Sequence, residues 1–299
     1  MTACWSFRGA SGRRELTLDR AAVIGILNVT PDSFSDGGAY ADAAAAADAA
    51  RRMLDEGAAM IDIGGESTRP GALRVAADEQ IRRVLPVIRA LRESGCNAPL
   101  CVDTTLEEVA LAALDAGADA INDVSAGEES SGGTFRVAAA RGCGIILMHR
   151  RVPPESDAYS HAHARDPEYV GGVVAAVRDF LSRRAGAALE AGVDRAAIVL
   201  DPGLGFGKSV AQNYELLARA RELASLGYPL LCAASRKSFI GAVTGEAEPR
   251  RRLAGSIAIA VMQFIRGVRL FRVHDVAAHV AALRTAAAAL AQGPESGRE

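Results

Sequence analysis

Short runs that are apolar on consecutive residues recur along most of the chain. Many of their side chains are β-branched, which is typical of strands buried on both faces of a sheet. The runs are Val23–Val29, Ala59–Ile63, Leu100–Val102, Ala118–Ile121, Ile145–Met148, Ala197–Leu200, Pro229–Ala233 and Val268–Val273. The pattern therefore predicts a series of short strands inside the core.

The stretches between these runs carry apolar residues at helical spacing. They are Asp42–Glu56, Asp78–Glu93, Leu106–Ala116, Pro167–Ala191, Ala211–Ala224, Arg250–Arg266 and Val276–Leu290. Several are followed by glycine, such as Gly57 and Gly95, and a glycine just past the last helical turn is a common C-terminal cap. Eight strands alternating with helices predict an α/β fold, either a closed (β/α)8 TIM barrel or an open doubly wound sheet.

The chain contains no segment of linker-like composition, so we expect one large domain. Within residues 1–20, two strand-like runs flank Gly9-Ala10-Ser11-Gly12, which predicts a hairpin that would cover the bottom of a barrel. Residues 21–293 form the main domain in this interpretation, and residues 294–299 form a short, frayed polar tail.

Charge and composition indicate which classes of molecule the protein binds. A formal net charge of −2 creates no strong field to attract nucleic acid or an anionic membrane. No apolar run reaches the ~18 residues of a membrane helix, and no signal-peptide pattern is visible at the N-terminus. The five cysteines are odd in number and form no C-x-x-C pair, which indicates reduced thiols in a cytosolic protein. We therefore expect a cytoplasmic protein that binds small molecules.

Every predicted strand delivers polar or charged side chains at its carboxyl end. These are Asn28; Asp62 and Glu66; Asp103; Asn122 and Asp123; His149; Asp201; Ser235, Arg236 and Lys237; and Arg272, His274 and Asp275. A single polar residue at such a position means only that the chain is leaving the core. In a barrel, however, all these ends meet on the face that carries active sites, and charges are seldom placed beside an apolar core without a role.

Three glycine-rich segments follow strands and could each be an ordinary connecting loop. Residues 28–38 and 64–71 are long and polar enough to close over a ligand. The third, residues 201–209, ends in Gly-Lys-Ser like a phosphate-binding P-loop, but Pro202 stands where that motif needs glycine. We therefore reject a nucleoside triphosphate site there and favour a carboxylate, Asp201, beside a loop that lets Phe206 approach a flat ligand.

The last strand and helix predict an anion site. Arg272 and His274 stand where the helix begins, with Asp275 as its expected N-cap, and a helix N-terminus attracts anions. A lone histidine there would more often be structural. In a closed barrel, however, the first strand lies beside the last, so Asn28 would join them. This combination favours phosphate or pyrophosphate as the ligand.

Taken in order, these segments resemble the dihydropteroate synthase family over residues 23–276. The long matches are Asn-Val-Thr-Pro-Asp-Ser-Phe-Ser-Asp-Gly-Gly, Gly-Gly-Glu-Ser-Thr-Arg-Pro-Gly and Asp-Pro-Gly-Leu-Gly-Phe-Gly-Lys. Val-Asp-Thr, Ile-Asn-Asp-Val, Ser-Arg-Lys-Ser-Phe and Arg-Val-His-Asp are the shorter ones. The resemblance implies a (β/α)8 barrel that condenses 6-hydroxymethyl-7,8-dihydropterin diphosphate with p-aminobenzoate to give 7,8-dihydropteroate and pyrophosphate. It also implies Mg²⁺, a dissociative mechanism and a homodimer formed through late helices.

The resemblance assigns roles by position. The implied pterin-binding residues are Asp103, Asn122, Met148, Asp201, Phe206 and Lys237. Those for pyrophosphate are Asn28, Arg69, Arg272 and His274, with Asn28 also on the metal. Those for p-aminobenzoate are Phe34, Thr68, Arg69, Pro70, Phe206 and Ser238. The catalytic set is Asp103, Asp36, Lys237, Arg272 and His274, in which Asp36 would orient the attacking amine and Asp103 would stabilise a cationic pterin.

Two other pterin-binding functions remain open at this point. A methyltetrahydrofolate:corrinoid methyltransferase would share the pterin carboxylates but would not need the loops at 28–38 and 64–71. A non-catalytic paralogue would show a degraded loop, and none is visible. The sequence departs from the family pattern after His149, where Arg150-Arg151-Val152-Pro153-Pro154 replaces the usual Gly-Thr-Pro segment, and at Thr105. The conformation of residues 150–166 is therefore uncertain from sequence.

Overall fold

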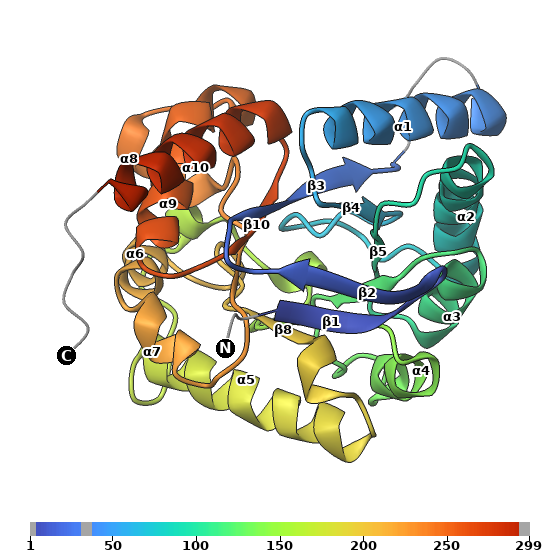
Figure 1. The fold of residues 1–299 in the computed structure, drawn as a ribbon. Helices are drawn as coiled ribbons and strands as arrows, with labels where there is room; N and C mark the ends of the chain where they lie inside the picture. Colours follow the sequence, from blue (N-terminus) through green and yellow to red (C-terminus); the bar gives the residue numbers. More distant parts are fainter. Residues whose placement is uncertain (1–3, 31–37, 293–299) are drawn as a thin grey trace.

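The computed structural model describes residues 4–30 and 38–292 and begins with a hairpin. β1 (Cys4–Gly9) pairs antiparallel with β2 (Gly12–Thr17), and Gly9 lies opposite Gly12 across the tight turn. The Trp5 side chain is fully buried and its Nε1 donates to the Ala197 carbonyl at 2.7 Å. The hairpin thus lies against the amino ends of the barrel strands, and in Figure 1 it crosses in front of them.

Within the described residues, eight parallel strands form the predicted barrel. They are β3 (Ala22–Asn28), β4 (Met60–Gly64), β5 (Leu100–Asp103), β6 (Ala120–Asp123), β7 (Gly144–Met148), β8 (Ile198–Asp201), β9 (Leu231–Cys232) and β10 (Leu270–Val273). The sheet runs β8-β7-β6-β5-β4-β3-β10-β9, and a parallel bridge between Leu200 and Leu230 joins its two edges. The open-sheet alternative is excluded, because these pairings close the sheet.

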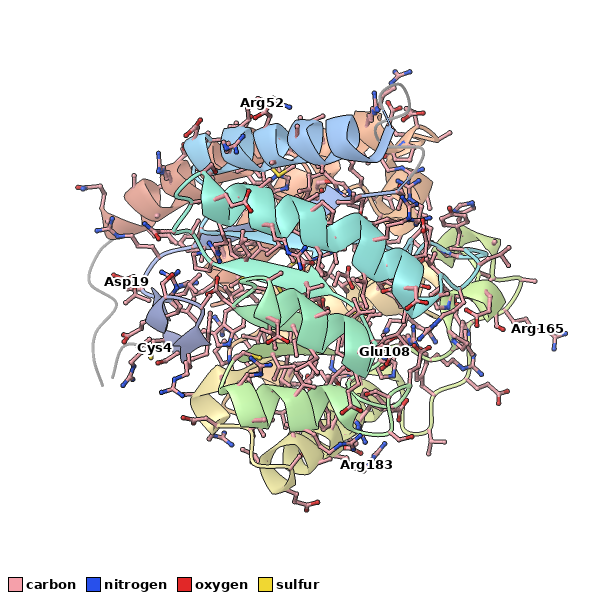
Figure 2. All side chains as sticks on the ribbon, turned by 90° about the vertical axis from the view of Figure 1, so that its right-hand side faces the viewer. Cys4, Asp19, Arg52, Glu108, Arg165 and Arg183 are labelled. Atoms are coloured by element: carbon pink, nitrogen blue, oxygen red, sulfur yellow. The ribbon has the colours of Figure 1, made fainter. Side chains whose placement is uncertain are left out.

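Helices surround the barrel and bury its outer face (Figure 1). The main ones are α1 (Gly38–Asp55), α2 (Ala77–Glu93), α3 (Glu107–Asp115), α4 (Gly133–Arg141), α5 (Val173–Glu190), α6 (Val210–Ala218), α7 (Ala220–Ala224), α8 (Ser238–Thr244), α9 (Leu253–Ile265) and α10 (Val276–Ala291). Short 3₁₀ turns are η2 (Pro154–Ser156), η3 (Ser160–Ala162), η4 (Arg195–Ala197) and η5 (Pro249–Arg252). Charged helix side chains such as Arg52, Glu108 and Arg183 are exposed (Figure 2).

Some helix boundaries differ from the sequence prediction. The helix expected from Pro167 begins only at Val173, because Gly171 and Gly172 adopt positive φ angles of 75° and 89° just before it. The single helix expected over Ala211–Ala224 is broken at Arg219 into α6 and α7. The short helix α4 was not predicted, and its N-cap residue Gly132 has a left-handed conformation that no apolar pattern reveals.

Two expectations from composition can be compared with the structure. Among the described residues, no helix has both the length and the apolar character that crossing a bilayer requires. All five cysteines are described and all are free thiols, with Cys101, Cys143 and Cys232 buried.

Candidate active site

Buried acidic and amide side chains meet at the carboxyl ends of the central strands. Asp62 on β4, Asp103 on β5, Asn122 on β6 and Asp201 on β8 all have little or no exposed surface. They come together because the carboxyl halves of parallel strands lie at the same end of the barrel. Three carboxylates in an apolar surrounding need cations or hydrogen-bond donors close by.

Arg272 on β10 supplies part of that compensation. Its Nε donates to Asp62 Oδ2 at 2.5 Å, and its Nη2 donates to Asp103 Oδ2 at 2.7 Å. Asn122 Nδ2 also donates to Asp62 Oδ2, at 3.0 Å. Asp62 therefore holds Arg272 and Asn122 in place, although sequence reasoning did not count it as a site residue. The available signal was a charged residue within an otherwise apolar strand.

The pKa values of these carboxyls reflect their burial. Burial raises the pKa of Asp103 to about 7, although the nearby Arg272 acts in the opposite direction. Burial also raises the pKa of Asp201, against the hydrogen bond that the Gly203 N–H donates to its Oδ1 at 2.7 Å. The Oδ1 atom of Asp62 is buried with no hydrogen-bond partner in the described part of the chain. The site therefore favours a ligand that brings N–H donors or positive charge.

Lys237 and Phe206 form the wall next to Asp201. The Lys237 Nζ lies 4.0 Å from the centroid of the Phe206 ring, a cation–π contact. Burial, together with the charge of Arg272, lowers the pKa of Lys237 to about 8. This close contact between Lys237 and the loop that carries Phe206 requires a glycine at 205. The φ angle of Gly205 is +82°, and an added Cβ would lie only 3.1 Å from Lys237 Cδ. Met148, Phe206 and Val124 make a small apolar cluster beside these polar groups.

Asn28 and His274 lie at the ends of neighbouring strands, as barrel closure predicts. β3 pairs with β10, with Ile24 opposite Arg272, so the two strand ends are neighbours. Burial and the charges of Arg236 and Arg272 lower the pKa of His274 to about 3, so its ring is neutral. Asp275 stands at the N-cap position of α10 but does not cap it. Its carboxylate instead accepts hydrogen bonds from Arg236 Nε at 2.9 Å and Nη2 at 2.5 Å.

A cavity of about 710 Å³ opens over this end of the barrel. The predicted site residues that line it are Asn28, Thr68, Arg69, Pro70, Phe206, Lys237, Ser238, Arg272 and His274. Asp103, Asn122, Met148 and Asp201 lie on the neighbouring strand ends. Phe34 and Asp36 lie outside the described residues. The structure thus gathers, around one cavity, side chains that are widely separated in the sequence.

Lys208, the lysine of the Gly-Lys-Ser segment, is fully buried under the loop after β8. Its Nζ donates to the carbonyls of Gly203 at 2.8 Å and Phe206 at 2.9 Å, and it lies 3.0 Å from His149 Nδ1. Burial lowers its pKa to about 7. These contacts support the loop that carries Phe206, which fits the rejection of a nucleotide phosphate role.

The loop after β7, whose conformation was uncertain from sequence, supports the same wall. The Asp157 carboxylate accepts from Gly207 N at 3.0 and 3.1 Å. Ser160 N donates to Ser238 Oγ at 3.2 Å, and Asn213 Nδ2 donates to Ser160 Oγ at 3.1 Å. Residues 150–166 therefore pack beside the cavity as a structured support.

Comparison with known proteins decides the family. The family model described as pterin binding enzyme matches residues 24–274. A dihydropteroate synthase from Streptococcus pyogenes serotype M3 is 45% identical over 260 residues, which cover 87% of this chain and 92% of the relative. The chain belongs to the dihydropteroate synthase family.

Solved structures of dihydropteroate synthases have the same fold. The Xanthomonas albilineans dihydropteroate synthase with 4-aminobenzoic acid superposes with a TM-score of 0.85 at 45% identity, covering 97% of this chain and 100% of the other. The same enzyme in complex with 7,8-dihydropteroate gives a TM-score of 0.81 at 44% identity, covering 94% and 97%. The resemblance stated from the motifs is confirmed, as is the predicted barrel with its N-terminal hairpin.

Proposed function

We propose that the protein is a dihydropteroate synthase, an enzyme that joins 6-hydroxymethyl-7,8-dihydropterin diphosphate to p-aminobenzoate and releases pyrophosphate. The observation that carries this proposal is the meeting of buried carboxylates with a cation-lined cavity at one end of the barrel. Relatives of this chain have been solved with 4-aminobenzoic acid and with 7,8-dihydropteroate. A corrinoid methyltransferase would not use the loop at 64–71, whose Thr68–Pro70 segment lines the cavity here.

The pterin would bind among the strand ends. Its ring presents an amino group and a ring N–H side by side, which a carboxylate such as Asp201 can accept together. Lys237 would donate to the ring carbonyl, and Asp103 and Asn122 would contact the remaining edge. Met148 and Phe206 would pack on the ring faces. Buried carboxyls with raised pKa values match a ligand rich in donors, since donors stabilise their charged form.

The diphosphate would bind where Asn28, Arg69, Arg272 and His274 face the cavity. No group of three or more His, Cys, Asp or Glu side chains among the described residues is arranged to hold a metal. Asn28 offers one amide oxygen, a donor set that fits Mg²⁺ arriving with the diphosphate, because Mg²⁺ takes most of its oxygens from phosphate and water. Bound there, Mg²⁺ would neutralise charge on the leaving group.

In the reaction, the C–O bond between the exocyclic methylene and the diphosphate breaks, and a C–N bond to the p-aminobenzoate amine forms. The amine loses a proton, and pyrophosphate departs with the bonding electrons. If departure comes first, positive charge spreads into the dihydropterin, where the Asp103 side chain would stabilise it. Thr68, Arg69, Pro70, Phe206 and Ser238 would hold p-aminobenzoate, together with Phe34 and with Asp36 as the residue that orients the amine.

Two further features belong to the proposal. The five free cysteines support a reducing compartment, the cytoplasm. The outward side of α9 supports a homodimer, because Leu253–Ile265 contains no charged residue and Ile265 is 55% exposed.

Substrate dependence tests the reaction. Pyrophosphate release should require the pterin diphosphate, p-aminobenzoate and Mg²⁺ together. Calorimetry should show p-aminobenzoate binding only after pyrophosphate and a pterin are present, since the loop at 64–71 must close over them. Pyrophosphate release that is indifferent to p-aminobenzoate, or tight binding of p-aminobenzoate to the bare enzyme, would contradict the proposal.

A further inference from the structure

The loop between β6 and α4, residues 124–132, is held rigidly by Asp123. The buried Asp123 Oδ1 accepts from Ser125 N at 2.8 Å and Ser125 Oγ at 2.7 Å, and its Oδ2 accepts from Gly127 N at 2.9 Å and Thr134 Oγ1 at 2.6 Å. Ala126 and Ser131 adopt left-handed φ angles of 51° and 50°, which side chains other than glycine tolerate only when the surroundings enforce them. The loop therefore presents its outer residues in a defined position.

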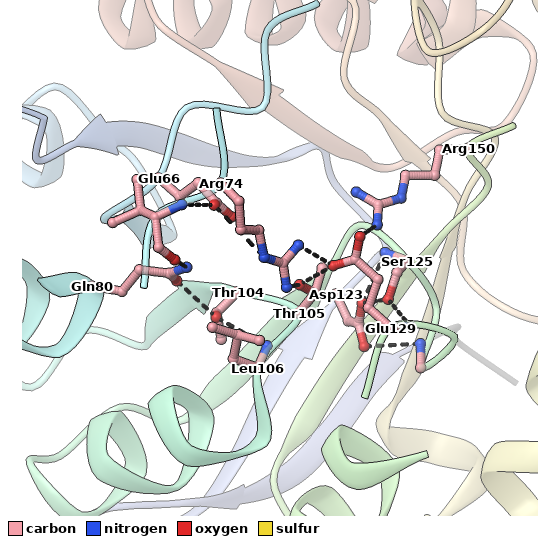
Figure 3. A network of polar contacts seen from close by, with 12 residues as sticks. Glu66, Arg74, Gln80, Thr104, Thr105, Leu106, Asp123, Ser125, Glu129 and Arg150 are labelled. Atoms are coloured by element: carbon pink, nitrogen blue, oxygen red, sulfur yellow. Dashed lines mark hydrogen bonds and ion pairs between the residues drawn. The ribbon is translucent and has the colours of Figure 1, made fainter. Parts of the chain in front are cut away.

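Glu129 is the residue of this loop that contacts the neighbouring loops (Figure 3). One carboxylate oxygen pairs with Arg74 and also accepts from Thr105 Oγ1, while the other pairs with Arg150. Its side chain is only 21% exposed, and that of Arg150 only 7%. Burial would raise the pKa of Glu129, but the hydrogen bonds from Thr105 and Arg74 outweigh it and lower the pKa. The carboxylate is therefore ionised at neutral pH.

Arg74 and Arg150 stand at the ends of two loops beside the cavity. Arg74 lies near the end of the loop after β4, in which Thr68, Arg69 and Pro70 line the cavity. Arg150 begins the loop after β7, in the segment where the sequence departs from the family pattern. The two loops also touch directly, because Gly71 N donates to the Pro154 carbonyl at 2.8 Å. Glu129 is thus a shared anion for two cations that would otherwise repel each other.

We propose that Glu129 is a positioning residue for the capture of p-aminobenzoate. By pairing with Arg74 and Arg150 it fixes the loop after β4 against the loop after β7, and so sets where Thr68–Pro70 lie over the cavity. This inference rests on the proposed role of that segment in binding p-aminobenzoate. Glu129 does not line the cavity and acts only through the loops.

Other contacts also hold the loop after β4, so we expect removal of the Glu129 charge to have a partial effect. Near its start, the Glu66 carboxylate accepts from Val75 N at 2.6 Å, and Gln80 Nε2 donates to the Val75 carbonyl at 2.9 Å. These bonds and the Gly71–Pro154 contact do not involve Glu129. Removing the Glu129 charge should therefore loosen the loop without unfolding it.

Glu129→Gln tests this, with Glu128→Gln as the matched control. Glu128 is the neighbouring residue, is exposed, and forms no ion pair with any described residue. In Glu129→Gln the KM for p-aminobenzoate should rise about threefold to tenfold, in the range of a partly buried ion-pair network, while kcat and pterin binding change little. Trypsin should cut after Arg74, within the loop after β4, faster than in the wild type. Glu128→Gln should behave as the wild type in every measurement.

The variant Arg150→Met tests the same ion-pair network independently. Its KM for p-aminobenzoate should rise, but less than in Glu129→Gln. In the variant that carries both substitutions, the KM should rise by less than the product of the two single factors, because both changes break one network. An unchanged KM in Glu129→Gln, or a pterin affinity that falls in parallel, overturns the inference. Faster tryptic cleavage with an unchanged KM also overturns it. Arg69→Ala distinguishes the positioning role of Glu129 from the proposed role of Thr68–Pro70. If that segment binds p-aminobenzoate, Arg69→Ala weakens p-aminobenzoate capture whether or not Glu129 positions the loop.

Discussion

Asp201 shows how one buried side chain can set ligand preference. Among the described residues, the hydrogen bond found for its carboxylate comes from Gly203 N, at 2.7 Å, and the charge of Lys237 lies close by. Burial has already removed most of its water, so its remaining acceptor capacity is best met by a ligand with paired donors.

Asp201→Ala should weaken pterin binding by about 1.5–3 kcal/mol, the usual worth of a hydrogen bond to a charged group. Titration calorimetry with a pterin measures this, with circular dichroism to establish that the variant is folded. Asp179→Ala on the exposed side of α5 serves as the control and should bind normally. Wild-type pterin affinity in a folded Asp201→Ala protein would remove Asp201 from the site.

The loop after β4 is the element that connects binding to turnover. It begins in buried backbone at Gly64 and ends at the start of α2, and between them Arg69 is exposed. The Arg69 side chain forms no ion pair with the described residues, whereas Arg74 is held by Glu129. One end of the loop is thus anchored, while its tip presents a free cation toward the cavity that it lines.

Arg69→Ala should strongly reduce turnover and the affinity for p-aminobenzoate while leaving pterin binding nearly intact, because Arg69 lies on the closing loop and not on a strand end. Steady-state kinetics and pterin calorimetry measure the two effects separately. Arg89→Ala, an exposed arginine on α2, is the control. A parallel loss of pterin affinity would mean that the loop belongs to the pterin pocket instead.

At the scale of the whole molecule, α9 has an outer side suited to burial. The helix carries no charge over its whole length, and Ile265 at its end is 55% exposed. α9 packs on α10, whose Leu290 is 51% exposed. Apolar helix surface of this kind marks an interaction surface, and a second copy of the chain is the occupant proposed here.

Sedimentation should therefore give twice the chain mass of 31.1 kDa for the wild type. A paired substitution, Ala258→Glu with Ile265→Glu, should give a monomer, because it places charge at the centre and the end of the uncharged side. Leu189→Glu on α5, also an exposed apolar position, should stay dimeric. A wild type that sediments as a monomer at micromolar concentration contradicts the dimer.

The parallel strands and their polar ends followed from the sequence pattern, whereas closure into a barrel was implied by the family resemblance and established by the strand pairings. Apolar runs of strand length reveal parallel strands because both faces of such strands are buried, and closure then brings β3 beside β10 whatever the side chains are. That is why Asn28 and His274 could be assigned to one site. The long motifs around Asp201 and Thr68–Pro70 identified the family, which the relatives confirm.

Only the tertiary structure decided which polar residues pair with one another. Arg272 contacts Asp62 across 210 positions of the chain, and Arg150 meets Glu129 at the junction of two loops. Lys208 turned inward to backbone carbonyls, although its motif looked like a phosphate site. Such contacts depend on side-chain direction and on loops whose paths are set by distant partners. Local periodicity carries no information about either, so the sequence located the site but not its internal connections.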